Sequence, residues 1–477
     1  MVFSAPEFLF FFLPATLAIY FIAPRRYRNV ILMVASLVFY IAGGGVLVVL
    51  LLASTVTDYV AGLVVARGLA TDRAQLSRAG VLMSLVVNVA LLGYYKYANF
   101  IVDQINAVAA NVGLGQIAWT TILLPIGISF YTFQSMSYTI DVYRQRAEPV
   151  RNLWDFTLFV SLFPQLIAGP IVRFHEIHEE LISRKTTTDG FAEGAVRFIW
   201  GLMKKVVIAD SVGLLVDEVF ALPGAGLTTA TAWIGVLAYT VQIYFDFSGY
   251  SDMAIGLGRL FGFHFPENFR RPYSAISITD FWRRWHITLS NWFRDYLYIP
   301  LGGSRGSQFT TYMNLGIVFL VTGFWHGANW TFVVWGAYHG VLLIIERVSG
   351  QRLIGEGEKG TVMRRGLTFF AVVVGWVLFR ADGLTHAWQM FEAMFTFRAG
   401  GLPPEVSLVM TTRAQIALVI GLSAVFLPRN FVGGIWVIKS STRLATAGRV
   451  GLALLALPYS LALVSSGSFS PFLYYQF

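Results

Sequence analysis

Two histidines set among aromatic residues are the first candidates for chemistry. His326 lies in "TGFWHGANW" (322–330), and His286 lies in "DFWRRWHITLSNWFRDYLYIPLGGSR" (280–305). Imidazole is the side chain best suited to moving protons near neutral pH. Apolar sequence continues on both sides of His326, and an ionisable group inside a membrane is a functional candidate by default. The alternative for His326 is a neutral ring, hydrogen-bonded within a buried contact between helices.

Arginine and tryptophan residues come directly before His286. The mixture of Arg283, Arg284 and Trp285 suits a helix at the membrane surface, with rings at headgroup level and guanidinium groups towards phosphates. The same arginines suit an anionic cofactor such as the phosphates of coenzyme A. Spacing alone does not separate the two interpretations.

Acidic residues form a second set of candidates. "YFDFSGYSDMAIGLGRLFGF" (244–263) places two aspartates beside an apolar span, where each can line a polar tunnel or pair with an arginine. The structural role is slightly favoured. The stretch "RFHEIHEE" (173–180) has weak metal-ligand spacing and reads better as a solvated amphipathic surface, so no metal site is predicted. The candidate tunnel-lining residues are Trp325, Asn329, Trp285, Arg283, Arg284, Asp246 and Asp252.

The composition decides which class of fold must hold these residues. Of the 477 residues, 56% are hydrophobic and 13% are charged, and the mean hydropathy is +0.63. A soluble domain cannot bury that much apolar surface, so we predict an all-α polytopic membrane protein. No cysteine is present, which excludes disulfides and thiolate chemistry. The net charge of +9 indicates basic cytoplasmic loops rather than a nucleic-acid partner.

Hydropathy predicts about ten spans in one membrane-embedded domain, residues 1–477, with both termini outside. Its parts are N-terminal spans (1–150), a catalytic core with re-entrant segments (151–350) and C-terminal spans (351–477). The apolar segments lie at 6–23, 29–42, 46–66, 79–98, 119–141, 154–171, 190–221, 229–249, 312–346, 366–381, 414–428 and 449–466.

Two of these segments are predicted to be broken. Pro164, Gly169 and Pro170 interrupt the run at 154–171, which we interpret as re-entrant. Segment 312–346 is too long for one span, and basic residues flank it on what we expect to be the same side. It is therefore predicted to form two short helices, with His326 near the break between them.

At the two histidine stretches the sequence resembles the membrane-bound O-acyltransferases, and more specifically the membrane subunit of bacterial alginate O-acetyltransferases. The likeness extends over nearly the whole chain. It includes "LLGYYKYANF" (91–100), "LLPIGISFYTFQSMSYTIDVYR" (123–144), "FPQLIAGPIVRF" (163–174), "AYTVQIYFDFSGYSDMAIGLG" (238–258), "GFWHGANWTFVVWGAYHG" (323–340) and the terminal "YYQF" (474–477).

The resemblance implies a multi-pass acyltransferase of the bacterial cytoplasmic (inner) membrane, with a central tunnel. The family's near-invariant histidine falls on His326 and its second motif histidine on His286. The expected donor is acetyl-CoA, with no permanently bound cofactor, and the expected acceptor is a secreted polysaccharide such as alginate. Membrane lipids and periplasmic acetyltransferase proteins are the expected partners.

An acetyl thioester is already activated, so the element still needed is a base for the attacking hydroxyl. A neutral imidazole at His326 can remove that proton, and the nearby glycines would let substrates approach the ring. His286 is left with three roles: orienting the acyl carbonyl, relaying the proton, or a structural contact. An acyl-enzyme is a further route.

Other functions fit the same features. The acceptor can instead be peptidoglycan or cellulose, or the reaction can be D-alanyl transfer to teichoic acid from a carrier protein. A transporter of a small anion or lipid-linked sugar shares broken helices and buried ionisable groups, but no inverted repeat is visible between the halves. A role as a scaffold for a secretion complex would not explain why a histidine lies at position 326.

Overall fold

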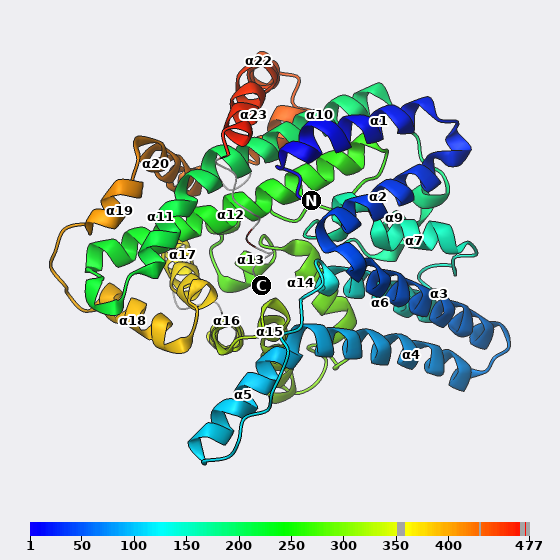
Figure 1. The fold of residues 1–477 in the computed structure, drawn as a ribbon, viewed down its shortest axis with the longest axis horizontal. Coiled ribbons are helices and arrows are strands. Elements are labelled where there is room, and N and C mark those ends of the chain that lie inside the picture. Colours follow the sequence, from blue (N-terminus) through cyan, green and yellow to red (C-terminus); the bar gives the residue numbers. More distant parts are fainter. Residues whose placement is uncertain (351–357, 429–430, 468–472, 474–477) are drawn as a thin grey trace. The chain divides into compact units, whose positions relative to one another are not determined.

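The computed structural model describes residues 1–350, 358–428, 431–467 and 473, and all regular elements within these ranges are helices (Figure 1). The all-α prediction is confirmed. The chain forms two compact units: residues 1–191 with 257–266 (unit 1), and residues 192–256 with 267–477 (unit 2). The single domain expected from sequence stays a prediction, and the terminal motif at 474–477 lies outside the described residues.

Several helical stretches are long and apolar enough to cross a membrane. Within the described residues these are Arg25–Ala70, Ala74–Asn111, Trp330–Val348, Thr361–Arg380 and Arg443–Ser465. Two shorter apolar helical stretches are Phe8–Ile22 and Thr412–Phe426. The protein is therefore a multi-pass membrane protein, as its hydropathy predicts.

Unit 1 is built from the N-terminal helices. They are η1 (Phe8–Phe12), α1 (Leu13–Ile22), η2 (Arg25–Tyr27), α2 (Arg28–Gly44), η3 (Gly45–Leu47), α3 (Val48–Ala70), α4 (Ala74–Leu92), η4 (Gly93–Tyr97), α5 (Ala98–Asn111), α6 (Ile128–Tyr143), α7 (Leu153–Ser161), α8 (Phe163–Leu166) and α9 (Phe174–Ile182). The predicted span at 119–141 begins later, at Ile128. Pro125 and Gly127, whose φ is +74°, end the preceding non-helical segment.

Helix α4 shows the inverted polarity of a helix in lipid. Its buried residues are small or polar and recur every three or four positions: Ser77, Gly80, Ser84 and Asn88. Leu82, Val86 and Val89 are exposed on other faces. Small residues let α3 and α4 approach closely, and the two helices run side by side in Figure 1.

A fully buried carboxylate joins three helices of unit 1. Asp58 on α3 accepts hydrogen bonds from Ser84 and from Asn88 (2.7 Å) on α4, and from Thr139 (3.1 Å) on α6. Every partner is a neutral donor. Because a polar group at membrane depth must find partners inside the protein, this network fixes the packing of α3, α4 and α6.

The run at 154–171 is broken where the sequence predicts. Helix α7 ends at Ser161, the four-residue α8 follows, and residues 167–173 are not helical. All residues from 156 to 172 are buried. Irregular backbone of this kind is tolerated within a membrane only when protein covers it.

Unit 2 holds most of the remaining helices. They are α10 (Thr188–Met203), η5 (Lys204–Ala209), α11 (Asp210–Ala221), η6 (Gly224–Gly226), α12 (Thr229–Leu260), η7 (Pro272–Ser274), α13 (Ile278–Trp282), α14 (Ile287–Phe293), η8 (Arg294–Tyr298), α15 (Gln308–His326), α16 (Trp330–Val348), α17 (Glu358–Arg380), α18 (Leu384–Phe395), α19 (Pro404–Val409), α20 (Thr412–Phe426), α21 (Gly433–Lys439), α22 (Arg443–Gly451), η9 (Leu452–Ala456) and α23 (Leu457–Ser465).

Segment 312–346 is the predicted pair of helices. Helix α15 ends at His326, and α16 begins at Trp330 after a three-residue break. The side chain of Asn329 caps α16 by accepting a hydrogen bond from the N–H of Thr331 (3.1 Å). The break follows from this cap and from the extended backbone of Gly327 (φ −161°).

The glycines near His326 serve helix packing rather than substrate approach. A Cβ atom on Gly323 would collide with the carbonyl oxygen of Phe332, and one on Gly327 would collide with the Phe332 ring. A Cβ atom on Gly336 would likewise collide with the carbonyl oxygen of Phe319. The structure thus gives these residues a different role from the predicted one, because they let α15 and α16 lie in direct backbone contact.

We predict that cysteines placed at Arg305 and Arg347 will react with a membrane-impermeant thiol reagent from the same side of the membrane. These positions flank the two-helix segment, and the chain has no native cysteine. Labelling from opposite sides would show that α15 and α16 do not return to the side from which they start.

Gly323→Ala is expected to destabilise the protein by about 1–3 kcal/mol, the usual cost of overpacking, because the neighbouring atom is rigid backbone. The matched control is Gly316→Ala on the same helix, where a Cβ meets nothing within 4 Å. Thermal unfolding of the detergent-purified variants measures the difference. Equal unfolding temperatures for the two variants would contradict the packing role.

Candidate active site

His326 is the last residue of α15 and is 3% exposed. Its imidazole ring packs edge-on against Trp335 of α16 (5.1 Å between ring centroids) and Phe379 of α17 (5.2 Å). The adjacent Trp325 ring lies 4.9 Å away. The sequence pattern therefore places a titratable ring in an enclosure of aromatic side chains, at the position where the helix breaks.

His286 is fully buried and has an unusual backbone conformation. It precedes α14 with a φ of +43°, in the left-handed region that non-glycine residues rarely adopt. Such a conformation costs about 1–3 kcal/mol and persists only where the surroundings impose it. Here the N–H of Ile287 donates to the carbonyl oxygen of Asn268 (2.9 Å), which holds the turn in place.

The side chain of Asn268 determines which nitrogen of His286 carries the proton. Its Oδ1 accepts hydrogen bonds from the N–H (3.3 Å) and hydroxyl (2.9 Å) of Thr288, so this atom is an acceptor. His286 Nδ1 lies 3.1 Å from the same Oδ1 and must therefore be the N–H donor. Asn268 Nδ2 in turn donates to Ser251 (3.0 Å).

This tautomer gives His286 a defined chemistry. The ring is fully buried, and burial disfavours the charged imidazolium, so the ring is neutral. With the proton on Nδ1, the lone pair is on Nε2, which can accept a proton but cannot donate to an acyl carbonyl. Of the three roles that the sequence leaves open for His286, this geometry favours proton transfer over orientation of the carbonyl.

One indole ring contacts both candidate histidines. Trp325 lies 6.3 Å from His286 and 4.9 Å from His326 between ring centroids. A second indole, Trp335, lies between His326 (5.1 Å) and His339 (5.0 Å). The structure thus brings together the two histidines that the sequence singles out. His339, for which the sequence supports no special role, joins the same aromatic cluster.

Three of the other predicted tunnel-lining residues have structural partners, and within the described residues Arg283 does not. Trp285 is buried and packs on Phe281 and Trp376, while Asn329 caps α16. Arg284 pairs with Asp280 (2.7 Å). Arg283 is exposed and lines a separate cavity of about 560 Å³ at the end of α16.

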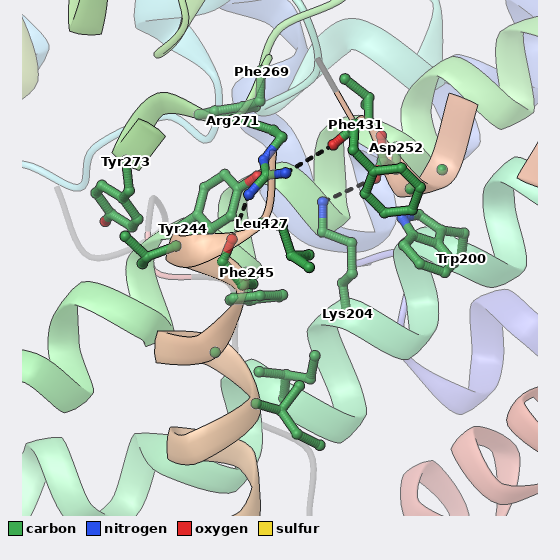
Figure 2. Close-up of a pocket in the computed structure, with 18 of the residues that line it drawn as sticks. Trp200, Lys204, Tyr244, Phe245, Asp252, Phe269, Arg271, Tyr273, Leu427 and Phe431 are labelled. Carbon is green, nitrogen blue, oxygen red and sulfur yellow. Dashed lines mark hydrogen bonds and ion pairs between the residues drawn. The ribbon is translucent and has the colours of Figure 1, made fainter. Parts of the chain in front are cut away.

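Both predicted aspartates are ion-paired, which agrees with the structural role that the sequence analysis favours. Asp252 bonds Arg197 (2.8 Å) and Lys204 (3.0 Å), and Asp246 pairs with Lys205 (2.9 Å). These pairs also explain how two adjacent lysines are accommodated in the apolar run at 190–221. Asp252 in addition lines a pocket (Figure 2), whereas the tunnel role of both residues stays a prediction.

Charged residues of the stretch 173–180 pair with other residues of unit 1. His175 Nδ1 lies 2.7 Å from Asp141, Arg173 pairs with Glu176 (2.6 Å), and Glu180 pairs with His264 (2.6 Å). No group of three or more potential metal ligands occurs within the described part of the chain.

Comparison of the sequence with known proteins identifies the family of this chain. Residues 128–353, which include both histidines, match the model of MBOAT, the membrane-bound O-acyltransferase family. The chain is 46% identical over 507 aligned residues to the probable alginate O-acetylase AlgI of Azotobacter vinelandii, with 100% of both chains covered. The chain belongs to the membrane-bound O-acyltransferase family. It is therefore an acyltransferase.

Two other members of the membrane-bound O-acyltransferase family act on cell-wall polymers, according to their names. The chain is 36% identical over 427 residues to the peptidoglycan O-acetyltransferase of Helicobacter pylori, with 83% of this chain and 80% of the relative covered. It is 30% identical over 233 residues to the teichoic acid D-alanyltransferase of Streptococcus thermophilus, with 46% and 56% covered.

Sequence reasoning misses the residues of this acyltransferase that hold the histidines in place. Asn268 is 18 positions from His286, and nothing in its local sequence marks it as a hydrogen-bond partner. Trp335 and Phe379 form the wall around His326 but lie on two other helices. A helical spacing of four between Trp335 and His339 is the one available signal, and it is common in packed helices.

We predict that Asn268→Leu will lower the acyl-transfer rate by about tenfold to a hundredfold, because removing an outer partner frees the tautomer and orientation of a histidine. Asn268→Asp keeps an acceptor for Nδ1 and is expected to retain more activity. The rates are compared at matched amounts of folded membrane protein. Equal loss in both variants would show that Asn268 acts through packing alone.

Proposed function

We propose that this acyltransferase takes an acetyl group from a cytoplasmic donor and passes it through the membrane for O-acetylation of a secreted polysaccharide, alginate or a similar polymer. The observation that carries the proposal is the likeness to the probable alginate O-acetylase of A. vinelandii over the whole length of both chains. The two buried histidines that share Trp325 supply a reaction centre for it.

The donor that we propose is acetyl-CoA. The 560 Å³ cavity offers a place for its phosphates at Arg283 and Arg364. The two carboxylates in its lining are bonded elsewhere, Asp280 to Arg284 and Glu346 to backbone N–H groups of α13. Arg283 is exposed and forms no ion pair with any described residue. Guanidinium groups bind phosphate oxygens through paired hydrogen bonds, so an unpaired arginine at a cavity suits this ligand.

The chemistry is the transfer of an acyl group from sulfur to oxygen. The acceptor hydroxyl attacks the acetyl carbonyl, its proton passes to an imidazole of the His326 and His286 pair, and the thiolate of the donor leaves. His286 Nε2 can receive a proton because Asn268 occupies Nδ1. General-base catalysis of this kind contributes about 10²–10⁴-fold in rate.

The location and partners follow from this role. A donor from the cytoplasm and a secreted acceptor place the protein in the cytoplasmic (inner) membrane of a bacterium. We propose that periplasmic acetyltransferase proteins complete the transfer to the polymer. Acylation of peptidoglycan is the second candidate, and the relative from H. pylori favours it.

The test is the acetyl ester content of extracellular alginate in a host strain whose own membrane acetylase gene is deleted, complemented with wild type, His326→Ala or His286→Ala. Both variants are expected to lose acetylation, by about a hundredfold or more, while polymer yield is unchanged. Variant levels in the membrane are matched by immunoblot.

The alternatives give different results. Unchanged acetylation in the His326 variant would contradict the proposed reaction centre. Loss of the polymer together with its esters would indicate transport or scaffolding. If the wild-type chain restores esters to peptidoglycan but not to alginate, the acceptor is peptidoglycan, the second candidate.

A further inference from the structure

A separate pocket lies beside the reaction centre in unit 2, with a volume of about 260 Å³. Side chains of α10, η5, α12, α20 and the turn at η7 line it (Figure 2). Phe269 forms part of its wall, and the Phe269 ring stacks 6.5 Å from His286 on the other side. The pocket is thus next to the active site but separated from His286 by this ring.

One end of the pocket is positively charged. The nitrogens of Arg271 and Lys204 point towards the same region in Figure 2. Both side chains are more than nine-tenths buried. A phosphate placed there would meet two cationic groups with little competition from water.

The charges of the surrounding ion pairs do not cancel that of Arg271. Asp252 and Glu267 balance Lys204 and Arg197, which are bonded to them at 2.7–3.1 Å. Arg271 instead donates to three backbone carbonyls at the end of α20, those of Ala424, Pro428 (2.6 Å) and Phe431 (3.0 Å). Among the described residues it has no carboxylate partner, so the pocket carries a net charge of +1.

The rest of the pocket is apolar and reaches the outer surface of a membrane helix. Phe245, Ile208 and Val425 form its walls. Ile420 belongs to its lining and is also 51% exposed, on the same face of α20 as Ile416 (54%) and Val419 (64%). Because α20 is one of the apolar helices, a ligand can reach the pocket from the hydrocarbon region.

We propose that this pocket binds an anionic phospholipid, with the phosphodiester at Arg271 and Lys204 and one acyl chain along Phe245, Ile208 and Ile420. The pocket matches the two parts of a lipid. Its cationic side chains lie near the end of α20, and apolar side chains line the rest of it. The volume lies below the roughly 300–1,000 Å³ of sites for drug-sized ligands, so a single chain and a phosphate occupy it rather than a whole lipid.

The geometry favours a phospholipid over a water-soluble anion. A soluble phosphate ester gains nothing from an apolar wall or from an opening at a half-exposed isoleucine. An acyl chain that enters from the hydrocarbon region instead packs against this wall as it packs against other lipid chains. This site does not depend on the proposed acceptor, since it rests on contacts outside the two catalytic histidines.

The experiment is a titration of the purified protein, followed by native mass spectrometry, with phosphatidylglycerol, phosphatidylcholine and diacylglycerol of identical chains. Ile420→Trp narrows the mouth of the pocket from a half-exposed position, where a larger side chain does not enter the packed core. Ile416→Trp is the matched control, one turn away on the same face and not part of the lining.

Wild type and Ile416→Trp are expected to retain one phosphatidylglycerol, and Ile420→Trp is expected to bind it about tenfold more weakly. Phosphatidylcholine and diacylglycerol are expected to bind more weakly than phosphatidylglycerol to the wild type. Equal binding by the two tryptophan variants, or equal binding of phosphatidylglycerol and diacylglycerol, would overturn the proposal. Displacement of the bound lipid by acetyl-CoA would also overturn it, because the pocket would then belong to the donor.

Discussion

A polar group at membrane depth has no water to bond with, and this constraint governs how the chain can hold chemistry. Asp58 meets it through neutral donors on two neighbouring helices, and Asp252 meets it through Arg197 and Lys204. Asp58 joins α3 to α4 and α6, and Asp252 joins α12 to α10 and η5. Buried polar residues therefore contribute to the fold as cross-links between helices, and they fix the framework around the site.

The two candidate catalytic histidines are also buried, and different contacts surround each ring. The Nδ1–H of His286 donates a hydrogen bond to Asn268, whose own orientation is set by Thr288 and Ser251. His326 is held by the rings of Trp325, Trp335 and Phe379 at the end of a helix. The hydrogen-bond network thus fixes the tautomer of His286, and aromatic side chains enclose His326. Trp325, which touches both, couples the two arrangements.

Much of this architecture can be predicted from the sequence, because hydropathy and helix-breaking residues act locally. Proline and glycine mark the breaks at 167–173 and at 327–329, and the composition alone requires a membrane protein. Local signals do not identify partners across the fold. Asn268 gives no sign of its contact with His286, and Lys205 gives none of its pairing with Asp246, 41 positions away. The glycines near His326 suggest room for substrate, whereas their neighbours show that they allow α15 and α16 to touch.

We propose that the two histidines in contact with Trp325 carry the acyl transfer, whereas His339, which packs on Trp335, does not. The most direct measurement is the rate of acetyl transfer from acetyl-CoA by the purified protein, with His326→Gln, His286→Gln and His339→Gln compared at equal amounts of folded enzyme. We expect the first two substitutions to lower the rate by about 10²-fold or more, and the third to leave most of it intact. An undiminished rate in His326→Gln, or an equal loss in all three, would contradict the account.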